Sequence, residues 1–181
     1  MQLTSNVDEE KLKPQIVIGI DPGIHGGIAA IESGEVIFSA ITPTYLGKPN
    51  WKDYDIEAMC IMLKRFDTNN SVVYLEKVSG WAGKGALGMF NFGRGVGMWE
   101  AIISLLGFRV VRVLPFDWQK IVYKDQTKIN KDTGARIAKK LFPGVDLTPG
   151  KIRKPHDGIT DAIMIALYGV KCVEAGVEKY E

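Results

Sequence analysis

The sequence contains few of the residues on which disulfide, thiolate and histidine chemistry depend. Its 181 residues include two cysteines, Cys60 and Cys172, and two histidines, His25 and His156. The cysteines lie far apart without metal-ligand spacing, so we expect structural thiols in a reducing, intracellular setting and a cytoplasmic protein. Two histidines cannot build a zinc site of the His-rich type, and no Ser-His-Asp arrangement is indicated.

Long apolar runs are also absent, and the chain is short. No stretch approaches the roughly 20 apolar residues that cross a bilayer, so no membrane association is expected. Residues 1–14 are polar and are predicted to form a solvated tail before a single domain, residues 15–181. A length of 181 residues leaves no room for the two lobes of a bilobal kinase. Hydrophobic residues make up 46% of the chain, which favours a folded core over disorder.

The net charge of +2 conceals one basic segment. Residues 120–154 carry ten Lys and Arg against three Asp and Glu, a net charge of +7. The segments before and after it are weakly acidic, at −2 and −3. Clustered positive charge is typical of a surface that binds phosphates, but an ordinary solvated surface has the same composition. The segment alone does not decide between the two.

Periodic apolar patterns predict an α/β domain. Five runs rich in β-branched residues predict strands at residues 15–20, 28–32, 35–41, 71–78 and 108–114. The first three are expected to pair antiparallel, and the fourth to lie beside the first. Helical spacing predicts helices at residues 54–66, 98–106, 132–141 and 157–170, with a short helix or turn at 117–120. Seven glycines within residues 79–97 predict a flexible loop there. The expected architecture is a mixed five-stranded sheet flanked by helices.

Four carboxylates stand at element ends or in apolar surroundings. Asp21 ends the first predicted strand, and Glu76 lies near the end of the fourth, so neighbouring strands would bring them to one end of the sheet. Asp157 and Asp161 are four residues apart and would share one face of the last helix. Each residue alone is also explained by a turn, an exposed strand position or a helix start. Together, their oxygens suit Mg²⁺ or Mn²⁺ rather than zinc, and these ions favour phosphate substrates.

Five segments in this order resemble the RuvC-type Holliday junction resolvases, with most similarity to the phage and plant chloroplast branches. They are IGIDPGIHGGIA, VVYLEKV, FNFGRGVGMWEAIISLLGF, VLPFDWQK and KPHDGITDAIMIALYG. The resemblance spans about residues 15–169. It implies an RNase H-like fold and a homodimeric endonuclease that nicks opposed strands of a four-way DNA junction. It also implies two Mg²⁺ ions per active site, with Mn²⁺ as a substitute, and no nucleotide cofactor.

The resemblance further implies which residues would hold the metal. Asp21, Glu76 and Asp161 match the family's first-strand, fourth-strand and final-helix acids. The fourth ligand is less clear, because Gly158 stands three residues before Asp161, where many bacterial relatives have an acid. Asp157 is the preferred substitute, and His156 is the competitor.

Two further groups of residues would contact the DNA. The basic residues implied as phosphate contacts are Lys120, Lys124, Lys128, Lys131, Arg136, Lys139, Lys140, Lys151, Arg153 and Lys154, together with His156. One of Lys151, Arg153 and Lys154 would stabilise charge in the transition state. The segment after the fourth strand would reach the junction centre, and its candidates are Trp81, Lys84, Met89, Phe90, Asn91, Phe92 and Arg94. Simple packing of these aromatic residues is the alternative explanation.

Parts of the sequence also allow other interpretations. Residues 83–88 spell G-x-G-x-x-G, but the acidic partner of a dinucleotide site is absent about 20 residues later. Residues 21–27 resemble a phosphate-binding hairpin of actin-like ATPases and sugar kinases, which would need a second domain. A binding module for branched DNA without activity, and a broader branched or flap endonuclease, remain as alternatives. The apolar helix at residues 98–106 suits both core packing and a dimer face.

Overall fold

A five-stranded mixed sheet forms the centre of the computed structural model, which describes residues 13–47, 51–77, 85–150 and 152–177. The strand order is β3-β2-β1-β6-β7. Strands β1, β2 and β3 pair antiparallel, whereas β6 runs parallel to β1 and β7 parallel to β6. The predicted mixed sheet and the position of the fourth predicted strand beside the first are therefore confirmed. The strands are β1 (Ile16–Asp21), β2 (Gly27–Glu32), β3 (Glu35–Ile41), β6 (Ser71–Glu76) and β7 (Arg109–Val113).

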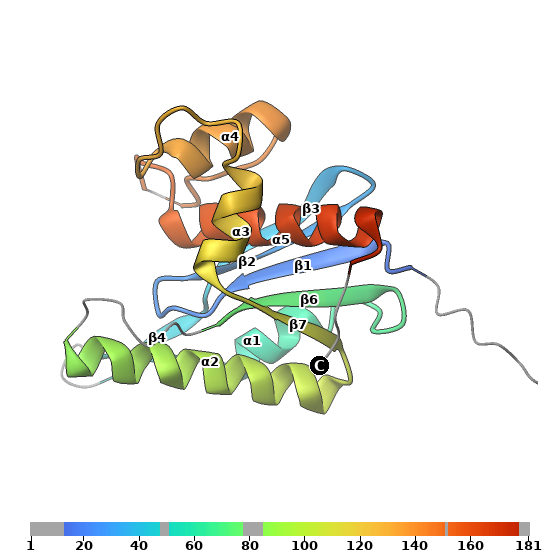
Figure 1. Cartoon of the computed structure of the whole chain (residues 1–181). Coiled ribbons are helices and arrows are strands. Elements are labelled where there is room, and N and C mark those ends of the chain that lie inside the picture. Colours follow the sequence, from blue (N-terminus) through green and yellow to red (C-terminus); the bar gives the residue numbers. More distant parts are fainter. Residues whose placement is uncertain (1–12, 48–50, 78–84, 151, 178–181) are drawn as a thin grey trace, which may run out of the picture.

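Helices cover both faces of the sheet (Figure 1). On one face lie α3 (Pro115–Val122), α4 (Thr133–Leu141) and α5 (Asp157–Ala175). On the other face lie α1 (Ile56–Leu63) and α2 (Ala86–Leu106). In the described part of the chain no helix is both long and apolar enough to cross a membrane.

The alternation of side chains along the strands decides which residues face α5. Val17 in β1 and Tyr74 in β6 belong to the apolar cluster on the α5 side. Ile20 and Leu75 belong to the cluster on the α1 and α2 side. Successive side chains of a strand point to opposite faces, so positions two or four residues beyond Val17 and Tyr74 return to the α5 face. Asp21 and Glu76 therefore both end their strands on the face that α5 covers.

A glycine allows α5 to approach β1 closely. A Cβ atom at Gly19 would collide with the main chain of α5 at the carbonyl oxygen of Ala162 and the nitrogen of Ala166. Small residues on the facing side of α5 are fully buried, including Ala162 and Ala166 themselves. This contact fixes the height of the helix over the strand, and with it the position of Asp161.

Two predicted boundaries were wrong at the glycine-rich segment and at the last helix. Residues 86–97, predicted as loop, form the first half of α2, while residues 78–84 lie outside the described part. Gly95 is buried where α2 meets the main chain of Pro22, so tertiary packing outweighs the low helix propensity of glycine. Helix α5 continues to Ala175, five residues beyond its predicted end.

A second, two-stranded sheet was not predicted. It pairs β4 (Thr44–Gly47) with β5 (Trp51–Tyr54) in antiparallel register. Both strands are four residues long, too short for a clear alternating pattern. The main-chain nitrogen of Thr42 donates to the carbonyl of Gly26 at 2.9 Å, which fastens the start of this hairpin to the end of the turn after β1.

Candidate active site

The strand register brings Asp21 and Glu76 to the same end of the sheet. Ile20 pairs with Leu75 across the parallel strands β1 and β6, and each carboxylate directly follows its member of that pair. Both residues are half-buried. Since both also face α5, they lie at one end of the contact between the sheet and that helix, the end toward which β1 runs in Figure 1.

Asp161 brings a third carboxylate to this end from α5. Burial, together with the negative charges of Asp21, Glu76 and Asp157 in that order, raises the pKa of its carboxyl to about 7. Asp161 thus lies within electrostatic range of the other three predicted carboxylates. All the contributions named for Asp161 disfavour its ionisation.

The turn after β1 fixes Asp21. The main-chain nitrogen of Gly23 donates to its Oδ1 at 3.0 Å, and the nitrogen of Gly26 donates to the carbonyl of Gly23 at 2.8 Å. A Cβ atom at Gly158 would collide with the main chain of His25 and Gly26. The N-terminus of α5 therefore lies directly against the turn, which explains how Asp157 comes to share the site.

Glu76 is held by a tryptophan that the sequence did not single out. The indole Nε1 of Trp118 donates to Oε1 of Glu76 at 2.9 Å, and the Trp118 side chain is 1% exposed. Its ring meets that of Tyr123 edge-on at 5.6 Å. Burial raises the pKa of the Tyr123 phenol, and the charges of Asp161 and Glu76 add to the effect. Helix α3 and the residue that follows it thus form one wall of the site.

His156 caps the helix that carries two of the carboxylates. Its Nδ1 accepts a hydrogen bond from the main-chain nitrogen of Ile159 at 3.4 Å. Burial lowers the pKa of the imidazole, the charges of His25 and Lys52 lower it further, and Asp157 opposes them. A neutral ring whose Nδ1 accepts carries its proton on Nε2. In this arrangement the outer nitrogen of His156 is a donor rather than a metal ligand.

The carboxylates are gathered but do not converge as a finished metal site. Among the described residues, no three Asp, Glu, His or Cys side chains stand where together they could hold an ion. The donor set nevertheless fits a hard cation, because it consists of carboxylate oxygens crowded by like charges. Such an ion would require the side chains to draw closer than they lie here.

Three pockets surround the carboxylates. One of about 250 Å³ lies between the turn after β1 and α2, and Asp21, Asn91 and Phe92 line it. A second of about 240 Å³ lies beside Asp161, and Lys131 is its basic residue. A third, of about 550 Å³, is lined by His25, Arg153, Lys154, His156 and Asp157. Asp21, Asp157 and Asp161 each line at least one of these pockets and are thus accessible to a ligand from more than one side.

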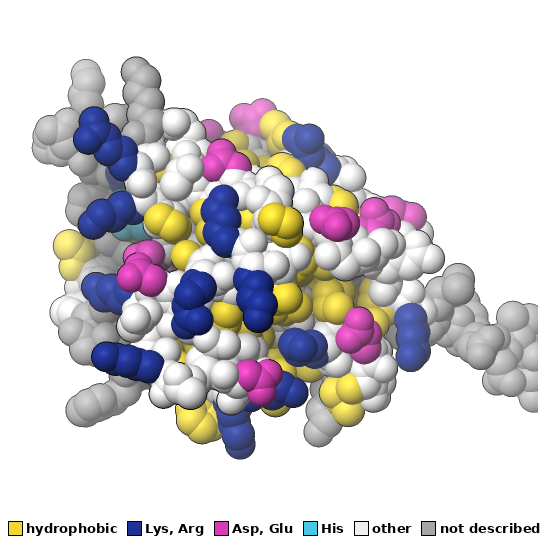
Figure 2. Space-filling model, turned by 90° about the horizontal axis from the view of Figure 1, so that it is seen from above, with side chains coloured by type: hydrophobic (Ala, Val, Ile, Leu, Met, Phe, Trp, Pro, Cys, Tyr) yellow, Lys and Arg dark blue, Asp and Glu magenta, His cyan; other side chains and the backbone are white. Residues whose placement is uncertain are grey.

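The basic residues predicted to bind phosphate lie at the surface. Figure 2 shows the face formed by α3, α4 and α5, with Lys and Arg side chains concentrated on the half toward the carboxylates. Lys151 lies outside the described residues. Lys139 also donates from Nζ to the carbonyl of Val145 at 2.7 Å. The exposed residues of this predicted set are Lys120, Lys124, Lys128, Lys131, Arg136, Lys139, Lys140, Arg153 and Lys154.

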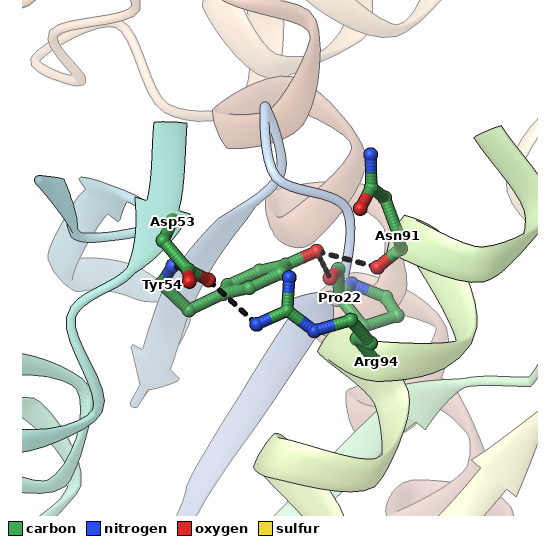
Figure 3. Close-up of polar contacts among 5 residues, drawn as sticks. All are labelled: Pro22, Asp53, Tyr54, Asn91 and Arg94. Carbon is green, nitrogen blue, oxygen red and sulfur yellow. Dashed lines mark hydrogen bonds and ion pairs between the residues drawn. The ribbon is translucent and has the colours of Figure 1, made fainter. Parts of the chain in front are cut away.

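The residues predicted to reach the junction centre lie on α2 rather than on a loop, with Trp81 and Lys84 outside the described residues. Met89 is half-buried, and Phe90 is 61% exposed. Arg94, predicted to contact DNA, forms an ion pair with Asp53 whose Nη2–Oδ1 distance is 2.7 Å (Figure 3). Of these residues, Asn91 and Phe92 come nearest to Asp21, in the pocket that they share with it.

The supporting residues Trp118, Tyr123 and Tyr54 were missed as members of the site. Trp118 stands in the VLPFDWQK segment, so a sequence signal existed, but nothing in the segment shows which group its indole nitrogen binds. Tyr54 belongs to the unpredicted hairpin, and its contacts depend on the path of α2. The contacts of Trp118 and Tyr54 can be recognised only from the tertiary structure.

Comparison with known proteins identifies the fold. No family model matches the sequence, and no curated protein matches it. The structure of Thermus thermophilus RuvC in complex with a Holliday junction substrate matches with a TM-score of 0.66 at 17% identity, covering 92% of this chain and 99% of that one. A second T. thermophilus RuvC structure matches with a TM-score of 0.62 at 18% identity and the same coverage. The chain has the RuvC fold, an RNase H-like fold, and the predicted resemblance is confirmed at the level of structure.

Proposed function

We propose that this protein is a structure-specific DNA endonuclease that resolves four-way junctions by metal-dependent hydrolysis of paired phosphodiester bonds on opposed strands. The observation that carries the proposal is the gathering of Asp21, Glu76, Asp157 and Asp161 at one end of the sheet, with the pKa of Asp161 raised to about 7. A protein that only bound DNA would gain from losing negative charge at this point. The RuvC fold, solved with a Holliday junction substrate in T. thermophilus, supports the substrate class.

The proposed metal ligands are these four carboxylates, which would hold two Mg²⁺ ions, with Mn²⁺ as a substitute. When bound, the ions would polarise the scissile phosphate and lower the pKa of an attacking water. His156 is the weaker candidate for the fourth ligand, because its Nδ1 caps α5 and its Nε2 carries the proton. The preference for Asp157 as the fourth ligand is therefore supported by the capping role of His156 as well as by sequence spacing.

The protein's own residues would orient the substrate. Trp118 holds Glu76 through its indole nitrogen, and the turn amide of Gly23 holds Asp21. The protonated Nε2 of His156 would donate to a phosphate oxygen. Lys131 lines the pocket beside Asp157 and Asp161, which makes it a candidate for stabilising transition-state charge alongside Arg153 and Lys154.

Paired nicking requires two active sites, so the proposal includes a homodimer. From the sequence, the apolar residues at the end of α2 suited both core packing and a dimer face, and in the structure some of them are buried and others are exposed. Trp99, Ile102 and Ile103 are buried in the core, whereas Leu105 is 86% exposed. Sedimentation of the purified protein would measure its oligomeric state, and paired cleavage by a stable monomer would contradict this part of the proposal.

The decisive experiment incubates the protein with a labelled four-way junction and with linear duplex of the same sequence, each with Mg²⁺ or EDTA. We expect paired nicks on opposed strands of the junction alone, abolished by EDTA and by Asp21→Asn. Asp67→Asn is the matched control, because Asp67 is exposed and precedes β6 at the other end of the sheet.

Two outcomes would favour the alternatives. Tight junction binding without cleavage in Mg²⁺ or Mn²⁺ would indicate a branched-DNA-binding module. Unpaired cleavage of flaps and forks as well as junctions would indicate a broader branched-DNA endonuclease.

A further inference from the structure

One buried hydroxyl connects three segments that are far apart in the sequence. Tyr54 ends β5, and its side chain is buried with 2% of the residue exposed. Its hydroxyl lies 3.2 Å from the carbonyl oxygen of Pro22 and 3.0 Å from that of Asn91 (Figure 3). A phenol carries one proton, so the two carbonyls share a single donor. The hydroxyl thereby ties the residue after Asp21 to the helix that forms the opposite wall of the pocket.

A neighbouring ion pair fastens the same hairpin to α2. Asp53, adjacent to Tyr54, pairs with Arg94 at 2.7 Å, and both side chains are about three-quarters buried, at 26% and 25% exposed. The guanidinium also lies 5.7 Å from the centre of the Phe90 ring. The hairpin is thus joined to α2 at Arg94 as well as at the Asn91 carbonyl.

The helix and the turn touch directly at this point. A Cβ atom at Gly95 would collide with the carbonyl of Pro22 and with the Tyr54 hydroxyl. A movement of α2 toward the turn by the size of a methyl group would therefore displace the turn that follows Asp21. Figure 3 shows the Tyr54 hydroxyl between the two main-chain oxygens.

We propose that Tyr54 is a positioning residue, whose hydroxyl sets the distance between the Asp21 carboxylate and the α2 wall formed by Asn91 and Phe92. The inference rests on the proposed nuclease function, since it assigns Tyr54 a role in the metal and substrate geometry of that site. The hydroxyl of Tyr54 reaches the main-chain carbonyls of Pro22 and Asn91, so it acts on the site through the main chain.

The hydroxyl keeps its proton over the range in which a nuclease would be assayed. Burial raises the pKa of Tyr54 to about 12, with Asp21 and Asp53 adding to the effect and Arg94 opposing it. The donor is therefore present at neutral and moderately alkaline pH. Its removal would leave two carbonyl oxygens in a buried contact without the proton that they share.

The test compares Tyr54→Phe with Tyr45→Phe. Tyr45 lies in β4 of the same hairpin and is 53% exposed, so its variant makes the same chemical change away from the contact. Single-turnover junction cleavage is measured across a Mg²⁺ titration, with junction affinity measured in EDTA. We expect Tyr54→Phe to raise the Mg²⁺ concentration for half-maximal cleavage by about 10-fold, the usual effect of losing a residue that orients a metal ligand. Junction affinity in EDTA should stay unchanged, and Tyr45→Phe should match the wild type.

Hydrogen exchange provides a readout that does not depend on catalysis. In the metal-free protein, Tyr54→Phe should accelerate amide exchange in residues 23–26 and 88–96 together, relative to Tyr45→Phe. If the wild type cleaves junctions and both variants share its Mg²⁺ requirement, the positioning role is wrong while the nuclease function stands. If the wild type cleaves nothing in any metal, the nuclease function fails, and unchanged exchange in either segment would then overturn the coupling as well.

Discussion

Ionisation of the half-buried carboxylate of Asp161 lowers the stability of the fold, and Asp161→Asn measures by how much. Asparagine keeps the size of the side chain and removes its ionisation. Burial, with the charges of Asp21, Glu76 and Asp157, raises the pKa of Asp161 from its ordinary value of 3.8 to about 7. Between these values the folded protein binds a proton that the unfolded chain has released. The contribution of Asp161 to stability is therefore largest below pH 4 and is lost as the pH rises through 7.

The pKa gives the size of the effect. The difference between 3.8 and about 7 corresponds to about 4 kcal/mol of unfolding free energy once both states are ionised. Somewhat less than half of this is already lost at pH 5, because the unfolded carboxyl is ionised there while the folded one is not. The stability of Asp161→Asn relative to wild type should therefore be greater at pH 8 than at pH 5 by about 2 to 3 kcal/mol.

Urea unfolding followed by tryptophan fluorescence, with EDTA present, would measure this difference. The control is Asp157→Asn, an exposed carboxylate one turn earlier on α5, whose effect should stay below about 1 kcal/mol at both pH values. Added Mg²⁺ at pH 8 should stabilise the wild type more than Asp161→Asn. An equal effect of Asp161→Asn at pH 5 and pH 8 would refute the reasoning that burial and like charges crowd this carboxylate.

Two further predictions concern the groups that hold the site in place. Trp118→Phe removes the hydrogen bond to Glu76, so the apparent Mg²⁺ affinity in a cleavage titration should fall by about 10- to 100-fold, and an unchanged titration would show that the indole does not orient Glu76. Gly19→Ala would push α5 away from β1, so thermal or urea unfolding should show a loss of about 2 kcal/mol or more, and a stability equal to wild type would contradict the close packing of the helix on the strand.

The sheet and the four carboxylates were predictable because local patterns specify them. The strands that carry Asp21 and Glu76 are continuous β-branched runs, and the residues that follow them break the pattern. The spacing of Asp157 and Asp161 places both on one face of a helix wherever that helix lies. The pairing of β1 with β6 brings Asp21 and Glu76 together, and the packing of α5 on β1 and on the turn after it adds Asp157 and Asp161.

The supporting contacts were not predictable because they depend on residues distant in sequence. The indole of Trp118 reaches Glu76 across 42 positions, and Tyr54 reaches Pro22 across 32. The hairpin that ends at Tyr54 has strands too short for a pattern, and the half of α2 that it contacts was predicted as a loop. Helix propensity counts glycine as a cost at every position, whereas the structure uses Gly95 for a close contact with the carbonyl of Pro22.

Some glycines of α2 only lower helix propensity, whereas Gly95 allows a close contact. Single substitutions can test these two roles separately. Gly93 and Gly97 are exposed, and an added Cβ atom would meet nothing within 4 Å at either position. Alanine at each should therefore stabilise the protein by about 0.5 to 1 kcal/mol through helix propensity alone. Gly95→Ala should instead destabilise it, because its Cβ atom would collide with Pro22 and Tyr54.

Urea unfolding of the three variants distinguishes helix from loop in this segment. A loss of stability in both Gly93→Ala and Gly97→Ala would show that residues 93–97 do not hold the helical conformation found here. If both variants gain stability and still resolve junctions, their glycines serve neither fold nor activity. If they gain stability but lose junction cleavage, the reason would lie outside the described part of the monomer, because an added Cβ atom meets nothing there within 4 Å beyond its own turn of helix. The open face of α2 would then be a surface that DNA or a second subunit approaches as closely as Pro22 approaches Gly95 on the buried face.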